Sequence, residues 1–466
     1  MDSQKMDPAC LILPMEQWLT SIADTDSLVA WSRTQRWQQS DFRFDVSQLV
    51  QRLKNLPHKR WALCFDNSYH FAVAMLATLY CGKIPVLPGH QRQSLLEEQL
   101  SEFDALLTDC SLSLPCPTLL LPITFSDENS FTENDSLIPL PEFPATASVV
   151  LFTSGSTGKP QKITKTITSL QTESRWLAQR WGLSLRKGRL AATVSSQHMY
   201  GLTFRFMLPL SLRVPFFAEN LEVHEQLIAM AQQFPLTVIS SPAFLQRLDP
   251  HLERVKCQQV FSAGGPLSVE TAAHVQKLCG TCPVDIYGTS ETGILASRQQ
   301  RLSETPWKLF DGVELLFENN SPTRAVSELI PQPEGIPLSD NLRIADNNRQ
   351  FHLLGRQDRI VKIAEQRLSL DEIEQRLCQL PTVAKACVLQ IEKKGRSYVA
   401  AVIVLSASGA ELLGKESQAA LTQGLRQSLR GWLAPVAIPR FWRVIQFIPM
   451  NLQGKIIYSE LRELFL

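Results

Sequence analysis

Two short segments combine glycine, hydroxyl and charged residues, and each directly follows an apolar run. The first is Thr153 to Lys162 (TSGSTGKPQK), with four hydroxyls, two glycines and two lysines. Glycines let backbone N–H groups turn toward an anion, hydroxyls donate to phosphate oxygens, and lysine adds positive charge. The spacing is not that of a Walker A loop, because Gly155 and Gly158 are too close together. The pattern predicts a phosphate-binding loop; the alternative is a Ser/Thr/Gly-rich surface loop.

The second segment is Ile286 to Gly293 (IYGTSETG), which also lies at the end of a predicted strand. An aromatic ring, small hydroxyls and a carboxylate would supply a stacking face, phosphate donors and a ligand for Mg²⁺. Open α/β sheets bind ligands at the carboxyl edge of their strands. This pattern predicts part of a nucleotide site; the alternative is a β-turn with a helix N-cap at Ser290.

A CxxC pair, Cys279 and Cys282, has the spacing of half a zinc site or of a redox motif. No second CxxC exists, and His274 is the nearest histidine. A helix over 268–278 is expected before the pair and a strand over 284–288 after it. We therefore expect a turn at the end of a helix, with thiols that have no joint function.

The elements that must position these segments alternate between strands and helices. The pattern predicts strands at 60–65, 83–88, 147–152, 236–241, 258–265 and 284–288, with helices at 69–80 and 221–233. The segment from 111 to 147 is rich in Pro, Ser, Thr and Asp and is typical of a loop. Alternating strands and helices predict a parallel α/β sheet that is covered on both faces.

The last hundred residues have a different character. An amphipathic helix at 368–380, a β-hairpin at 384–405 and a helix at 418–432 predict a compact α+β unit. The predicted fold class is therefore α/β: a large N-terminal domain (1–356) of parallel-rich βα sheets covered by helices, and a small C-terminal α+β domain (357–466) on a hinge.

Composition excludes several classes of protein. The 466 residues include 46 Lys and Arg and 45 Asp and Glu, so a near-zero net charge of +1 gives no electrostatic footprint for nucleic acid. The N-terminus lacks the pattern of a signal peptide, and the longest apolar segment, 71–87, is interrupted by Lys83 and Pro85. We expect a cytoplasmic protein without membrane insertion, whose ten scattered cysteines stay reduced.

Four motifs together resemble the signatures of the adenylate-forming superfamily. They are TSGSTGKPQK, YGTSETG, LLGRQDRIVKI and IPMNLQGKI, and they occur in the family's order from Thr153 to Lys455. The superfamily comprises acyl- and aryl-CoA synthetases, adenylation domains of nonribosomal peptide synthetases and firefly luciferase. The resemblance implies ATP and Mg²⁺ as cofactors, and CoA or a carrier-protein phosphopantetheine as thiol acceptor.

The resemblance also implies roles for single residues. Tyr287 would stack on adenine, Ser290 would contact the α-phosphate and Glu291 would bind Mg²⁺. Asp340 would accept the ribose hydroxyls, and Asp358 would be the hinge. The implied catalytic residues are Lys455, Glu291 and His198. The implied nucleotide-binding residues are Thr153, Ser154, Gly155, Ser156, Thr157, Gly158, Lys159, Lys162, Gly264, Gly265, Tyr287, Gly288, Thr289, Ser290, Asp340 and Arg356.

His198 occupies the position where family members often carry a histidine or aromatic residue at the mouth of the acyl pocket; a packed, half-buried histidine is the alternative. Amino-acid-activating members place an aspartate in this region to pair with the substrate ammonium. No carboxylate occurs between Gln197 and Leu212, and a buried ammonium without a partner is unfavourable. We therefore expect a small carboxylic acid as substrate.

Three departures from the family pattern matter. Gln161 follows Pro160 where the family usually has Lys-Gly, so Lys162 or Lys165 would supply the charge. The stretch from Glu291 to Asp340 is short, and Glu365 replaces an expected glycine. The expected function is an AMP-forming acid–thiol ligase that loads an acyl carrier protein or CoA. The alternatives are an adenylating enzyme with a non-thiol acceptor and a degenerate nucleotide-binding regulator.

Overall fold

The computed structural model divides into two compact units, each described here by itself. It describes residues 12–466, except 20–24, 123–139, 155–159, 303–304, 319–320, 346–347, 357–358, 364–365, 394–395, 431 and 452–455. The large unit comprises Met1–Glu314 and Ala325–Ile336, and the small unit comprises Leu315–Arg324 and Pro337–Leu466. The chain changes unit within β16 (Val313–Glu318), β17 (Ser321–Ser327) and β18 (Ile336–Pro337), which form one three-stranded sheet.

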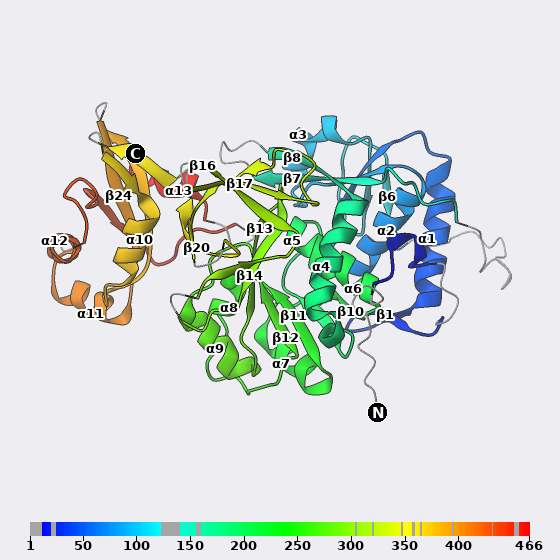
Figure 1. The fold of residues 1–466 in the computed structure, drawn as a ribbon, viewed down its shortest axis with the longest axis horizontal. Helices are drawn as coiled ribbons and strands as arrows, with labels where there is room; N and C mark the ends of the chain where they lie inside the picture. Colours follow the sequence, from blue (N-terminus) through cyan, green and yellow to red (C-terminus); the bar gives the residue numbers. More distant parts are fainter. Residues whose placement is uncertain are drawn as a thin grey trace. The chain divides into compact units, whose positions relative to one another are not determined.

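The first sheet of the large unit carries the YGTSETG segment (Figure 1). Its strands in this unit lie in the order β15 (Trp307–Leu309), β14 (Gly293–Arg298), β13 (Val284–Thr289), β12 (Gln259–Ser262), β11 (Leu236–Ser240), β9 (Arg189–Ala192), β10 (Phe216–Asn220), β1 (Leu28–Trp31) and β2 (Arg36–Gln38). Neighbours from β13 to β1 are parallel, whereas β14, β15 and β2 run antiparallel to the strands beside them. The predicted strands β11, β12 and β13 are confirmed.

Helices cover both faces of this sheet. The helices α7 (His224–Gln233) and α9 (Val269–Cys279) pack apolar side chains against Val238 and Val260 on one face. On the other face, Phe261 contacts Trp181 of α4 (Ile167–Leu185) and Phe204 of η6 (Leu202–Met207), at 5.1 and 5.2 Å between ring centroids. Burial on both faces explains why these strands are continuous apolar runs.

The second sheet of the large unit carries the predicted phosphate loop. Its order is β6 (Thr118–Leu120), β5 (Ala105–Thr108), β3 (Arg60–Cys64), β4 (Ile84–Leu87), β7 (Ser148–Ser154) and β8 (Pro160–Thr166). The βαβ unit of β3, α2 (Ser68–Tyr80) and β4 is confirmed, and Asn67 caps α2 by accepting from two backbone N–H groups. The two predicted nucleotide segments therefore lie on two different sheets. The remaining helices of this unit include α1 (Gln39–Lys54), α3 (Gln93–Glu98) and α8 (Pro242–Gln246).

A continuous helical run follows His198. It comprises α5 (Met199–Gly201), η6 and α6 (Leu208–Leu212), and its middle part, η6, is π-helical. Single π-helical turns inside α-helices are rare, and they are frequent at functional sites.

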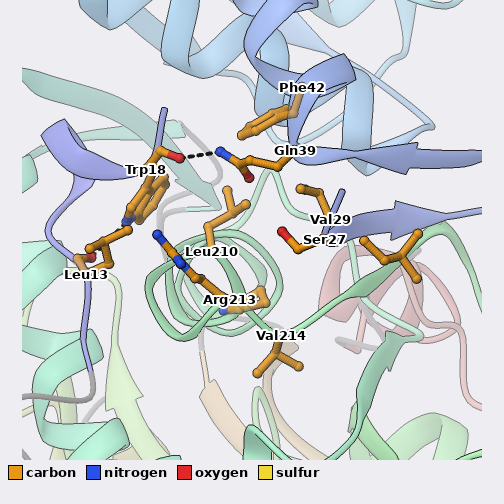
Figure 2. Close-up of a pocket in the computed structure, with 11 residues that line it drawn as sticks. Leu13, Trp18, Ser27, Val29, Gln39, Phe42, Leu210, Arg213 and Val214 are labelled. Atoms are coloured by element: carbon orange, nitrogen blue, oxygen red, sulfur yellow. Dashed lines mark hydrogen bonds between the residues drawn. The ribbon is translucent and has the colours of Figure 1, made fainter. Parts of the chain in front are cut away.

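Near the described start of the chain, a pocket lies between α1, β1 and α6. Figure 2 shows Gln39 of α1 donating a hydrogen bond to the Trp18 carbonyl, beside Leu210 and Arg213. The Leu13 N–H donates to Ser211 O at 2.9 Å. These contacts fasten the described N-terminal segment to the large unit.

The small unit has its own hydrophobic core. Its strands are β19 (Asp340–Ile344) with β20 (Gln350–Arg356), β21 (Ile360–Ile363) with β22 (Gln366–Ser369), and β23 (Val383–Lys393) with β24 (Arg396–Leu405) and β25 (Phe441–Val444). Its helices are α10 (Leu370–Cys378), α11 (Ala407–Lys415), α12 (Gln418–Leu429) and α13 (Tyr458–Glu463). Leucines of α10 and α12 pack on the valines and alanines of β23 and β24. The predicted helices and hairpin are confirmed.

The CxxC pair lies at a helix end, as predicted. The helix α9 ends at Cys279, and Gly280 caps it with φ of +70° while donating to Gln276 O at 3.0 Å. Cys279 and Cys282 are both buried. Among the described helices, none is long and apolar enough to cross a membrane.

Candidate nucleotide and active site

The described ends of the predicted phosphate loop belong to two paired strands. Strands β7 and β8 pair antiparallel up to Ser154 and Pro160, with Thr153 opposite Gln161. The predicted binding residues Gly155, Ser156, Thr157, Gly158 and Lys159 lie outside the described residues. Their roles, and those of Thr153 and Ser154, remain predictions.

The two lysines that could replace the missing family lysine have different environments. Lys162 is half exposed, and its Nζ pairs with Glu102 Oε2 at 2.9 Å. Lys165 is only 3% exposed, and its Nζ donates to the backbone carbonyl of Glu291 at 2.7 Å. Burial lowers the pKa of Lys165, and Glu173 and Glu291 act in the opposite direction. Lys165 is therefore committed to the turn that carries Glu291.

Glu291 lies on a tight, internally braced turn between β13 and β14. Thr289 and Thr292 hold it through reciprocal bonds: the Thr289 N–H donates to Thr292 Oγ1 at 3.1 Å, and the Thr292 N–H donates to Thr289 Oγ1 at 3.2 Å. A Cβ at Gly288 would lie 2.2 Å from Gly293 O, so the turn requires glycine there. The Glu291 carboxylate has no hydrogen-bond partner among the described side chains and backbone groups, so it can accept a ligand.

Tyr287 and Gly264 lie at the same level of the sheet edge. Ser262 and Asp285 are register partners in the parallel strands β12 and β13, and Gly264 and Tyr287 each follow two residues later. Gly264 has φ of +87°, and a Cβ there would meet no atom within 4 Å. Tyr287 packs against Trp307 at 5.6 Å between ring centroids. The absence of atoms around Gly264 is compatible with the predicted role of Gly264 and Tyr287 on either side of an adenine ring, which remains a prediction.

His198 lies against Gly89, next to the strand that leads into the phosphate loop. A Cβ on Gly89 would lie 2.7 Å from His198 Cε1 and 3.7 Å from Phe152 O. Gly89 follows β4, whose neighbour is β7. The structure thus brings His198 close to the phosphate-loop strand; its contact with an acyl substrate remains a prediction.

Gly265 and Ser290 are the chain neighbours of Gly264 and Glu291 in the large unit, whereas the other predicted residues belong to the small unit. Asp340 and Arg356 are direct cross-strand partners of the β19–β20 hairpin, so residues sixteen positions apart come together. Asp358, Glu365 and Lys455 lie outside the described residues, so the hinge, the loop role and the catalytic lysine remain predictions. The domain boundary at residue 356 depends on that hinge and also remains a prediction.

Sequence reasoning missed Asp285, which lies fully buried on β13. Its Oδ2 accepts from Arg298 at 3.2 Å, while its Oδ1 has no partner among the described groups. Burial raises the pKa of Asp285 to about 7, against the lowering effect of Arg298. A carboxylate within the apolar run VDIYG was the available signal.

Sequence reasoning also missed Glu173 on α4. Its Oε2 accepts from Thr203 at 3.0 Å, so a carboxylate does reach the segment 197–212. Its Oε1 accepts from the Ile294 N–H at 3.0 Å. Since both oxygens are engaged and Lys165 is the nearby cation, Glu173 is not available to a substrate ammonium. The expectation of a carboxylic acid substrate is therefore kept, for an additional reason.

The residues present fit a Mg²⁺ that is held partly by nucleotide phosphates. Across the described ranges, no three His, Cys, Asp or Glu side chains form a metal-binding group. Mg²⁺ commonly binds through one or two carboxylates and substrate phosphates, retaining several waters. The single free carboxylate of Glu291 suits that mode and does not suit a metal cage made by the protein alone.

Comparison with known proteins identifies the family. Residues 17–319 match the model of the AMP-binding enzyme family, and residues 372–455 match the AMP-binding enzyme C-terminal domain. The chain therefore belongs to the AMP-binding enzyme family, as the four motifs indicated.

Similar proteins include CoA ligases. A probable CoA ligase of Humulus lupulus is 24% identical over 373 residues, which cover 68% of this chain and 61% of the relative. A malonate–CoA ligase of Arabidopsis thaliana is 23% identical over 385 residues, covering 71% and 63%. The matched regions span about three fifths of these relatives' lengths. The structure of ATP-bound MatB from Rhodopseudomonas palustris superposes with a TM-score of 0.79 at 17% identity and covers 99% of both chains, which shows a shared fold.

Proposed function

We propose that this protein is an AMP-forming acid–thiol ligase. It joins an aryl or acyl carboxylate to the AMP part of ATP with release of pyrophosphate. It then transfers the acyl group to the thiol of CoA or of a carrier-protein phosphopantetheine with release of AMP. The observation that carries the proposal is the Glu291 carboxylate, which accepts no hydrogen bond from the described groups and lies on a turn held by Thr289 and Thr292 at the end of the strand that carries Tyr287.

The chemistry needs positive charge more than a base. The substrate carboxylate is ionised at pH 7, so it attacks the α-phosphorus without proton removal. Two anions approach one another, and groups that stabilise the resulting charge lower the barrier most. Glu291 would hold Mg²⁺, which neutralises phosphate charge when bound. The loop lysines and Lys455 would add cations, and Ser290 would donate to the α-phosphate.

The proposed first step has a direct test. ATP–pyrophosphate exchange is measured across a panel of aryl acids, aliphatic acids and amino acids. We expect exchange with one or more carboxylic acids and none with the common α-amino acids. Exchange with an amino acid alone would contradict the substrate class, and no exchange with any acid would favour a nucleotide-binding regulator.

The proposed second step uses an acid that supports exchange. CoA, a phosphopantetheinylated carrier protein and a simple amine are offered separately, and thioester or amide is detected by mass spectrometry. Thioester formation is expected. Amide formation without thioester would identify the enzyme as one with a non-thiol acceptor.

A further inference from the structure

Two buried charged side chains make hydrogen bonds to the backbone of the turn that carries Glu291. Lys165 on β8 and Glu173 on α4 are 3% and 2% exposed. Lys165 Nζ donates to Glu291 O at 2.7 Å, and Glu173 Oε1 accepts from the Ile294 N–H at 3.0 Å. Lys165 therefore binds the backbone of the turn just before Thr292, and Glu173 binds it just after Gly293.

The two charges depend on each other. Burial raises the pKa of Glu173 and lowers that of Lys165, and each charge opposes the effect of burial on the other. An apolar pair of similar volume would avoid this desolvation and is often as stable or more stable. The charged pair differs from an apolar pair in making directional hydrogen bonds. Each of its two groups holds one backbone atom of the turn at hydrogen-bond distance.

Lys165 also joins the two sheets of the large unit. Lys165 lies on β8, which is the returning strand of the hairpin that carries the phosphate loop. Its hydrogen bond ends on the turn between β13 and β14 of the other sheet. Glu173 also accepts a hydrogen bond from Thr203 of η6 at 3.0 Å, which holds its side chain in place.

We propose that Lys165 and Glu173 are positioning residues that orient the Glu291 carboxylate relative to the phosphate-loop hairpin. This inference rests on the proposed function, in which Glu291 binds the Mg²⁺ of the nucleotide. Its consequence is specific: disrupting the pair should weaken the contribution of Mg²⁺ to ATP binding more than it weakens ATP binding itself.

The test compares ATP affinity with Mg²⁺ and with EDTA, measured by isothermal titration calorimetry on the full chain. The ratio of the two dissociation constants is the magnesium gain. Lys165→Met and Glu173→Gln should each reduce this gain at least fivefold, with less than a twofold change in affinity in EDTA. The double variant removes both charges, so it should regain melting temperature without regaining the magnesium gain; it also serves if a single variant fails to fold.

Matched controls lie elsewhere in the large unit. Lys83 Nζ donates to Leu56 O and His58 O, each at 2.7 Å. Asp45 accepts from the Tyr69 hydroxyl at 2.6 Å. Lys83→Met and Asp45→Asn remove comparable bonds and should lower the melting temperature while leaving the magnesium gain unchanged.

Glu291→Gln distinguishes failure of the positioning role from failure of the proposed metal site. If it abolishes the gain while Lys165→Met, Glu173→Gln and the double variant all keep the wild-type gain, the positioning role is overturned and the proposed function stands. If Glu291→Gln keeps the wild-type gain, or the wild type shows none, the metal site of the proposed function is wrong and the positioning role falls with it.

Discussion

Two arginines that meet at Glu219 have very different environments. Arg205 is 1% exposed and donates to Val194 O at 2.8 Å, Ala218 O at 3.1 Å and Glu219 O at 2.6 Å. Arg33 pairs with the Glu219 carboxylate at 2.6 Å, but its side chain is 63% exposed. Buried carbonyls that lose a donor destabilise a fold, whereas exposed ion pairs contribute little.

Arg205→Met should therefore be much more destabilising than Arg33→Met. We expect a loss of about 3 kcal/mol for Arg205→Met and under about 1 kcal/mol for Arg33→Met. Thermal unfolding followed by circular dichroism checks this difference. Equal shifts in melting temperature would show that the carbonyls around Arg205 find other donors.

Asp285 gives stability a pH dependence. Its folded-state pKa of about 7 lies above the ordinary value of 3.8, so the folded protein holds a proton that the unfolded chain releases. The stability that this proton provides is lost as pH rises through 7. Relative to wild type, the melting temperature of Asp285→Asn should shift upward between pH 5 and pH 8. A difference between the two proteins that stays constant over this range would contradict the raised pKa.

Glu291→Gln keeps the size of the side chain and removes its charge. Since the carboxylate accepts no hydrogen bond from the described groups and acts on Lys165 only through its charge, folding should depend on it weakly. We expect at least a tenfold fall in ATP–pyrophosphate exchange, about 1.4 kcal/mol of barrier, with a near-normal melting temperature. Full activity would mean that Mg²⁺ is held by another residue.

At the scale of elements, alanine substitutions at two glycines should have opposite effects. A Cβ at Gly288 would lie 2.2 Å from Gly293 O, so Gly288→Ala must open the Glu291 turn and should reduce exchange at least tenfold. Gly424 lies inside α12, where a Cβ would meet no atom within 4 Å. Gly424→Ala should stabilise the protein by about 0.5–1 kcal/mol with unchanged exchange. Exchange assays and thermal unfolding of both variants test the pair.

Elements with strong apolar runs were predictable from sequence. The strand predicted at 60–65 is β3 (Arg60–Cys64), and the helix predicted at 69–80 is α2 (Ser68–Tyr80). The strand predicted at 258–265 ends earlier, at Ser262, because Gly264 leaves the extended conformation at φ of +87°. An apolar run shows that a strand is buried, but it does not show which strands are its neighbours. The division into two sheets was therefore not predictable from these patterns.

The part of the site that lies within one motif was predictable from sequence, whereas contacts from distant segments were not. The motifs placed Tyr287 and Glu291 at the same end of one strand, because adjacent residues in sequence stay adjacent in space. Glu173 contacts this turn from a helix 121 positions away from Ile294, and no local pattern reports such a contact. A glutamate on a helix is usually exposed, so only the fold reveals that this one is buried.

At the scale of the whole molecule, the proposed reaction has two steps, and Lys455 should serve only the first. A lysine that contacts the α-phosphate stabilises the transition state of adenylation and not that of thioester formation. Lys455→Ala should slow acyl-adenylate formation at least a hundredfold, about 2.7 kcal/mol. Transfer to the thiol from acyl-adenylate made beforehand should remain normal.

Rapid-quench measurement of each half-reaction tests this division. Asp358→Pro, which fixes φ at the predicted hinge, provides the complementary variant and should slow transfer more than adenylation if it holds the adenylating form. Equal slowing of both steps by Lys455→Ala would assign the lysine a structural role.

The π-helical segment Leu202–Met207 is a place where the helix could be shortened by one residue. A π-turn uses more residues than an α-turn, so a helical run that contains one resembles an α-helix with an inserted residue. Deleting one residue from this segment would allow ordinary α-helical winding with little rotation of His198 relative to α6, because the π-turn already accommodates the extra residue. Substitutions change this helix one side chain at a time, whereas this deletion would change the backbone hydrogen bonds of the whole segment at once. For evolution or for engineering, a single-codon deletion here would show whether the π-helical winding itself is needed for the proposed activity.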